Sequence, residues 1–385
     1  MIKNSFFIFA VAIFILFLTG CIDDLEEESA EEIKDSSNNT LYAEDWGTED
    51  VYGAFASHYA LMYEDFTFSD SVGNTVMVQS PFSLMVTDSC NSKSSCERKS
   101  IFVKSWIPGF TDTTSNTAFL NPSETVILPL NYNFNDEALL SIKSAKKTQR
   151  KIEAYVLKDN QKTLFYSISQ PVTIHPMQVF GESETYFLVD DSYKYYWYSL
   201  WVTPMADSIS RIVNEVAKKL PNGQLLVYQQ YSQDKSIEQS SIRVIRAVFE
   251  VLQSRNIKYI ENTGAASLGQ RVNYPVETLR KRQGICIETA TLFASVLERL
   301  DFQTYLIFIP GHVFVGWLSE RNGNSIDLIE TTMIGNKNVD YADAINMGRD
   351  EYNEQIQLGM FESGESMIVD IELARQMGIV PNNIP

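Results

Sequence analysis

Apolar stretches of strand length dominate the first half of the chain. Five of them lie between about residue 70 and residue 178, where polar turns separate the ranges 75–86, 101–108, 124–132, 151–157 and 163–169. β-branched and aromatic side chains are typical of strands, and short strands at regular intervals are typical of a β-sandwich. The pattern therefore predicts a β-rich, sandwich-like domain over residues 45–178.

The segment 45–66, at the start of this domain, has two interpretations. Val51, Phe55, Tyr59 and Tyr63 recur at every fourth position, which is the spacing of one helix face. The alternative is that the segment forms a first pair of strands.

Beyond Pro176 the spacing of apolar residues becomes helical. A first helix, ended by Pro221, is predicted from the apolar positions Ile209, Ile212, Val213, Val216 and Leu220. A second begins at Ser236, where Ser-Ile-Glu-Gln matches a capping box. A third begins at or near Cys286 and buries the apolar residues Leu292, Phe293, Val296, Leu297 and Leu300.

The segment 186–201 is dense in aromatic side chains, among them Tyr195, Tyr196, Trp197 and Tyr198. The first interpretation is a strand packed at a junction between domains. The alternative is an exposed platform that binds a polymer or a peptide.

Three more strands are predicted after the third helix, over residues 304–309, 312–318 and 325–331. The Asn-Gly pair at 322–323 is typical of a hairpin that joins the last two. Short helices are predicted over 341–348 and 370–378. The chain is therefore predicted to be α+β, with a second domain over residues 179–385.

The N-terminus has the features of a secretory signal. Lys3 precedes an apolar run over residues 6–18 that is too short for a confident membrane span. The run ends in Leu-Thr-Gly-Cys at 18–21, which resembles the lipobox of prokaryotic lipoproteins. That resemblance implies cleavage after residue 20 and a lipid on Cys21, which would anchor the chain in the cell envelope on the extracytoplasmic side. The alternative is an uncleaved N-terminal anchor.

Residues 22–44 are predicted to be an acidic, flexible tether, since eight Asp and Glu lie between Asp23 and Asp35 and large apolar residues are scarce. The whole chain has a formal net charge of −18, which argues against nucleic acid as a partner. Its 385 residues, 44% of them hydrophobic, suffice for two domains.

The chain has four cysteines. With Cys21 assigned to the anchor, Cys90 and Cys96 lie in one polar loop, where a local disulfide is predicted outside the cytosol and two free thiols are the alternative. No histidine lies near this pair, so a metal site is not predicted there. Cys286 is left unpaired, which marks it as a candidate reactive thiol.

Three side chains in the second half can form a nucleophilic triad. At a helix start, free N–H groups favour the thiolate of Cys286, although a buried, inert cysteine is the alternative. His312 follows Pro-Gly at the start of a strand, and antiparallel pairing brings it near the far end of the next strand. Glu330 lies at that end. Position and side-chain alternation favour Glu330 over Asp327 as the carboxylate that orients the imidazole.

These residues carry a resemblance to a known family. The sequences Gly-Ile-Cys-Ile-Glu-Thr-Ala at 284–290, Gly-His-Val-Phe-Val at 311–315 and Leu-Ile-Glu-Thr-Thr at 328–332 resemble the transglutaminase-like superfamily, over roughly residues 180–385. The resemblance implies a cysteine-protease-type α+β domain in which the helix bearing Cys286 packs on an antiparallel sheet. Glu330 stands where that family usually has aspartate.

The resemblance also implies a chemistry. Cys286 would attack a carboxamide or peptide carbonyl to form an acyl-enzyme, with His312 as base and then acid and Glu330 as the orienting group. The Cys286 N–H is a candidate oxyanion donor, and Gln270 is a candidate side-chain donor whose alternative is a turn residue. No cofactor and no metal ion are expected.

The sequence thus supports two hypotheses of different classes. The first is a lipid-anchored thiol enzyme that acts on peptide or protein amide bonds, with hydrolysis favoured over amine transfer because water is the abundant acceptor outside a cell. The second is a catalytically inactive binding or envelope-scaffold lipoprotein that keeps the fold.

Overall fold

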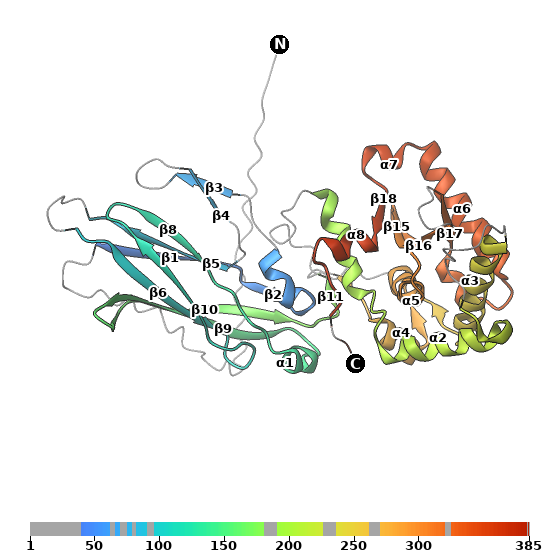
Figure 1. Cartoon of the computed structure of the whole chain (residues 1–385), viewed down its shortest axis with the longest axis horizontal. Helices are drawn as coiled ribbons and strands as arrows, with labels where there is room; N and C mark the ends of the chain where they lie inside the picture. The colour runs from blue at the N-terminus through green and yellow to red at the C-terminus, as the bar shows by residue number, and fades with distance from the viewer. Residues whose placement is uncertain are drawn as a thin grey trace, which may run out of the picture. The chain divides into compact units, whose positions relative to one another are not determined.

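The computed structural model describes residues 40–61, 66–69, 75–78, 82–90, 96–180, 191–225, 236–261, 270–319, 325–382 and 384. These residues belong to one compact unit, and they form a mixed α+β structure with several sheets (Figure 1). The α+β class predicted from the sequence is therefore correct. The boundary predicted between residues 178 and 179 falls inside this unit and stays a prediction. In the described part of the chain, no helix combines the length and the apolar character that crossing a membrane requires.

Two main sheets occupy the N-terminal half. A three-stranded antiparallel sheet has the order β1 (Leu41–Gly47), β5 (Phe82–Asp88), β8 (Thr125–Pro129). A five-stranded sheet has the order β2 (Asp50–Tyr52), β10 (Gln161–His175), β9 (Lys146–Lys158), β6 (Lys99–Trp106), β7 (Thr114–Leu120), and its β2–β10 pair is parallel. The short strands β3 (Phe66–Ser69) and β4 (Thr75–Val78) pair with each other, and helix α1 spans Asp136–Ser141.

The five predicted strand ranges all overlap observed strands, with three differences. The range 75–86 contains two strands, because β4 ends at Val78 and β5 begins at Phe82. Strand β7 was not predicted, since its sequence Thr-Ser-Asn-Thr-Ala-Phe-Leu has few β-branched apolar residues. Strand β1 begins at Leu41, so the predicted tether cannot extend to residue 44. Residues 22–39 of the tether lie outside the described residues.

The segment 45–66 is a mixture of the two predicted alternatives. Strands β1 and β2 cover its start, and a 3₁₀ helix, η1 (Gly53–Leu61), follows them. The fourfold spacing arises because Val51, Phe55 and Tyr59 are all buried, although they belong to two different elements.

A buried ion pair joins the two main sheets. Arg150 on β9 donates from Nη1 and Nη2 to the two carboxylate oxygens of Asp45 on β1, at 2.8 and 2.5 Å. Both side chains are almost fully buried. Burial raises the pKa of Asp45, and the charge and hydrogen bond of Arg150 oppose that rise.

The aromatic segment forms a 3₁₀ helix, η2 (Asp191–Trp201), so the predicted strand is wrong there; residues 186–190 lie outside the described residues. The platform interpretation also fails for Trp197, Tyr198 and Trp201, which are buried. The Trp201 ring packs against Tyr274, and its Nε1 donates to the carbonyl of Val272 at 2.9 Å.

The second half is built around a four-stranded antiparallel sheet. Its order is β17 (Ile326–Ile329), β16 (His312–Leu318), β15 (Thr304–Ile309), β18 (Met367–Asp370). Helix α5 (Cys286–Arg299) packs against β15 and β16, and α6 (Tyr341–Gln357) packs against β17 (Figure 1). Every residue of α5 from Ile287 to Leu297 is buried, because this helix is covered by the sheet and by other helices.

All five helices predicted in this half overlap observed helices. They are α2 (Asp207–Lys219), α3 (Ser236–Ser254), α5, α6, which runs past the predicted end at residue 348, and α8 (Ile371–Gln376). The capping-box side chains at 236–239 lie outside the described residues. The remaining elements are η3 (Pro221–Gly223), α4 (Pro275–Lys281), η4 (Thr331–Gly335), α7 (Met360–Ser363) and the short strands β11 (Val179–Phe180), β12 (Lys258–Tyr259), β13 (Gln270–Arg271) and β14 (Gln283–Gly284).

We expect Arg150→Ala to lower the free energy of unfolding by about 3–5 kcal/mol, because the change leaves the buried Asp45 carboxylate without its partner. Urea denaturation measures this. Lys158→Ala on the same strand is the matched control: its pair with Glu97 is exposed and contributes less than about 1 kcal/mol. Equal losses in the two variants would contradict the assignment of Arg150 as the link between the sheets.

Candidate active site

The thiol of Cys286 lies at the first residue of α5. The preceding helix, α4, ends at Arg282 in the left-handed conformation. At Gly284, a Cβ atom would lie 3.1 Å from the Thr278 side chain and 3.2 Å from the Glu288 carboxylate. Only glycine therefore passes this point without displacing a neighbour, and the chain turns directly into α5. Cys286 is a free thiol and is partly exposed.

Glu288 fixes the turn in front of the thiol. Its Oε1 accepts hydrogen bonds from the backbone N–H and the side-chain amide of Asn273, at 2.8 and 2.6 Å. Its Oε2 accepts from the N–H of Ile285 at 3.1 Å. Burial raises the pKa of Glu288, and these hydrogen bonds oppose the rise. Glu288 thus ties the loop at Asn273 to the first turn of the helix that carries Cys286.

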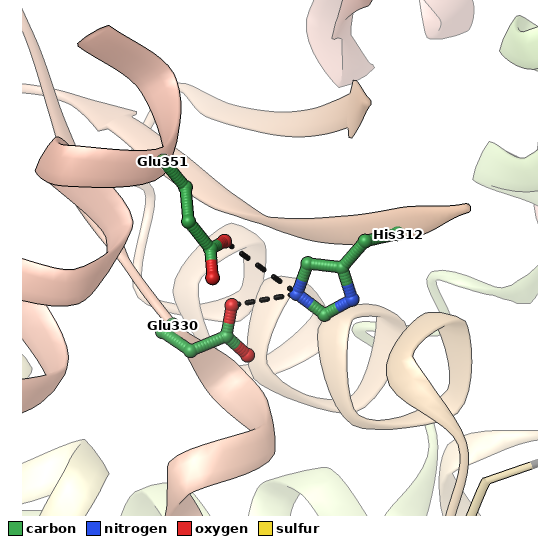
Figure 2. Close-up of side chains that lie close together, drawn as sticks. All are labelled: His312, Glu330 and Glu351. Atoms are coloured by element: carbon green, nitrogen blue, oxygen red, sulfur yellow. Dashed lines mark hydrogen bonds and ion pairs between the residues drawn. The ribbon is translucent and has the colours of Figure 1, made fainter. Parts of the chain in front are cut away.

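His312 and Glu330 meet at one end of the β16–β17 pair. Val315 lies opposite Ile329, so Glu330, one residue beyond β17, is a diagonal neighbour of His312. His312 Nε2 donates to Glu330 Oε2 at 2.7 Å (Figure 2). The rejected carboxylate, Asp327, accepts from Arg349 at 2.7 Å and from Ser319 at 2.8 Å instead.

Glu330 is buried, and both of its oxygens have hydrogen-bond donors. While Oε2 binds His312, Oε1 accepts from the N–H of Thr332 at 2.7 Å and from its hydroxyl at 2.6 Å. Burial by itself would raise the pKa of Glu330, but the hydrogen bond and the charge of His312, with the two Thr332 bonds, lower it below its ordinary value. The side chain is therefore a carboxylate at neutral pH.

The imidazole of His312 connects this carboxylate to the thiol. Burial opposes a charge on the ring, but the hydrogen bond to Cys286 and the hydrogen bond and charge of Glu330 outweigh it and raise the pKa of His312 to about 10. The ring is therefore an imidazolium at neutral pH. Because Nε2 faces Glu330, Nδ1 is the nitrogen left for Cys286.

A second carboxylate approaches the same nitrogen. Glu351 on α6 has its Oε2 3.7 Å from His312 Nε2, and both dashed contacts in Figure 2 end on that atom. Burial and the charge of Glu330 raise the pKa of Glu351 to about 7, against the opposing charge of His312. Sequence reasoning missed this residue because its position depends on how α6 packs against β17.

Within the described residues, His312, Glu330 and Glu351 are also the group whose spacing would suit a metal ion, since their ligand atoms lie within 4.8 Å of one another. We do not assign them as ligands, because the hydrogen bond from His312 Nε2 to Glu330 already accounts for that nitrogen and that oxygen.

Tyr259 adds a phenol that the sequence did not suggest. Burial raises the pKa of Tyr259, and the nearby charges of Cys286, Glu261 and Glu330 raise it further. Its hydroxyl is therefore within electrostatic reach of the thiol. The side chain is 42% exposed. It lies on β12, which pairs with β14, and β14 ends two residues before Cys286.

The other predicted site residues have contacts of their own or lie outside the described residues. The carboxamide oxygen of Gln270 accepts a hydrogen bond from the Tyr198 hydroxyl at 3.4 Å, and its role as an oxyanion donor stays a prediction. Cys90 and Cys96 form a disulfide with their Cα atoms 5.9 Å apart. Cys21 lies outside the described residues.

No model of a known protein family matches this chain, and no curated protein matches it in sequence.

Glu288→Ala should lower the free energy of unfolding by about 1–3 kcal/mol, because it leaves the N–H groups of the half-buried Asn273 and the buried Ile285 without an acceptor. Glu288→Gln, which retains one oxygen, should lose less. Thermal and urea unfolding measure both variants. Glu362→Ala, an exposed change on α7, is the control. If Glu288→Ala were as stable as the control, Glu288 would not hold the turn before Cys286.

Proposed function

We propose that this protein is a transglutaminase-like thiol enzyme that acts on peptide or protein amide bonds through Cys286, His312 and Glu330. The observation that carries the proposal is the imidazole of His312, which hydrogen-bonds the buried carboxylate of Glu330 and lies close enough to Cys286 for the sulfur to raise its pKa. A nucleophile, a base and a group that orients the base are the parts that acyl transfer through a covalent intermediate requires.

In the proposed reaction, the Cys286 thiolate attacks the carbonyl carbon of the amide. The imidazolium of His312 then gives its proton to the departing nitrogen, so the C–N bond breaks and a thioester remains on Cys286. A water molecule next attacks the thioester through its oxygen, and the neutral imidazole takes a proton from that water. The carboxylic acid leaves, and the thiolate–imidazolium pair is restored.

Glu330 and the start of α5 support the two charges that appear. Glu330 holds the ring through Nε2 and stabilises its positive charge. As the first helical residue, Cys286 has an N–H with no acceptor inside the helix, and it can donate to the oxyanion of the tetrahedral intermediate. Gln270 remains a proposed second donor.

The proposal extends to the architecture and the location of the protein. We infer a sandwich-like domain over residues 45–178 followed by a transglutaminase-like domain over 179–385, in which α5 packs on the β17–β16–β15–β18 sheet. The lipobox-like sequence ending at Cys21 supports a lipid anchor that holds both at the cell envelope. The proposed partner is a peptide or protein substrate, and water is the favoured acceptor.

The test is incubation of the full chain in mild detergent with an unfolded protein such as casein and a fluorescent primary amine. We expect hydrolysed product in excess over amine-labelled product, and an acyl adduct on Cys286 after acid quenching, detected by peptide mass. Glu330→Gln should lower the rate by about a hundredfold to ten-thousandfold. Asp327→Asn, the same chemical change on the neighbouring carboxylate, should keep the wild-type rate.

Amine-labelled product in excess would favour transfer over hydrolysis. Absence of any product and of any adduct, in a folded protein, would contradict the proposal and favour the inactive binding or scaffold lipoprotein.

A further inference from the structure

Helix α6 is held unusually close to the backbone at Glu330. Ala344, Gly348 and Glu351 are spaced four and three residues apart, so they lie on one face of the helix. The carbonyl of Ala344 accepts a hydrogen bond from the N–H of Glu330 at 3.0 Å. A Cβ atom at Gly348 would lie 3.1 Å from the backbone nitrogen of Glu330 and from Ile329. A larger residue at position 348 would therefore push the helix away from the site.

This packing brings the Glu351 carboxylate beside Nε2 of His312. The Glu351 side chain comes from the helix and the imidazole from the strand, and Glu330 approaches the same nitrogen from below α6 (Figure 2). The Oε2 atom of Glu351 is buried and has no hydrogen-bond partner among the residues that the structure describes. A buried carboxylate oxygen without a donor is costly, and a proton shared with a neighbouring carboxylate removes that cost.

Four charged or titratable groups face Glu351 or act on it through the ring. They are His312 on β16, Glu330 at the end of β17, Glu354 on α6 and, across the imidazole, Cys286 on α5. Glu330 and Glu354 repel a negative charge on Glu351, and the imidazolium attracts it. Because both carboxylates face the same nitrogen of one imidazolium and their oxygens lie within 4.8 Å of each other, the two carboxylates can hold one further proton between them.

We propose that Glu351 is a positioning residue of the active site. It shares a proton with Glu330 and thereby sets how tightly the imidazole of His312 retains the ring proton. The inference rests on the function proposed above and deepens it. When Glu351 is ionised, two carboxylates hold the imidazolium and the resting thiolate pair is stabilised. When Glu351 is protonated, it donates to Glu330, which weakens the hold of Glu330 on the ring and eases transfer of the His312 proton to the leaving nitrogen.

The test is a titration of the imidazole signals by NMR, on the full chain in detergent with EDTA present to remove metal ions. The chain has three histidines. His312 is identified by loss of its signal in His312→Ala, and His58 is distinguished because burial lowers its pKa to about 4. In the wild type we expect the His312 signal to show a first inflection near pH 7, from Glu351, and a second near pH 10, from the ring.

In Glu351→Gln the first inflection should disappear, and the pKa of His312 should fall by about one unit, a tenfold change in proton affinity. Asp350→Asn removes the same charge from the exposed side of α6 and should leave both inflections unchanged. An unchanged His312 titration in Glu351→Gln would overturn the inference. If that variant does not fold, a single inflection in the wild type overturns it.

The two proposals fail in different ways. If His312 titrates near its ordinary value of 6.5 in the wild type, both the triad and the role of Glu351 are contradicted. If His312 keeps its raised pKa and Cys286 forms acyl adducts while Glu351→Gln changes nothing, only the role of Glu351 is contradicted.

Discussion

The hydrogen bond between His312 Nε2 and the buried carboxylate of Glu330 is the contact on which the site depends. It requires the β16–β17 register that makes the two residues diagonal neighbours, and it requires Thr332, which satisfies the second oxygen of Glu330. It also fixes the ring so that its other nitrogen is left for the thiol. Without this carboxylate, burial would favour a neutral imidazole, and the positive charge beside Cys286 would be lost.

The arrangement concentrates charge at a partly buried site. A carboxylate and an imidazolium lie at the edge of a sheet covered by α5 and α6, and the thiol lies at the positive end of α5. Glu288 and Gly284 fix the turn before the thiol, while Gly348 lets α6 approach from the other side. These contacts hold the groups in place before any ligand arrives, which is the condition for the electrostatic catalysis that we propose.

Local signals in the sequence predicted the strands β15 and β16 with their observed bounds and the start of α5 at Cys286. The choice of Glu330 over Asp327 followed from alternation and from the antiparallel pairing of two adjacent strands. Glu351 and Tyr259 were missed because each reaches the site through packing between elements distant in the sequence. The 3₁₀ helices η1 and η2 were missed because buried aromatic residues in consecutive short elements imitate helix or strand periodicity.

The most direct test of the account is the pH dependence of alkylation of Cys286 by a neutral reagent, followed by peptide mass. The account predicts rapid reaction below the pH range in which ordinary thiols ionise, about 8.5, and loss of that reaction in His312→Ala, with Glu330→Gln intermediate. All variants must be folded. Reaction of the wild-type protein only at the pH of an ordinary thiol, unchanged in His312→Ala, would contradict the thiolate–imidazolium pair and the enzyme built on it.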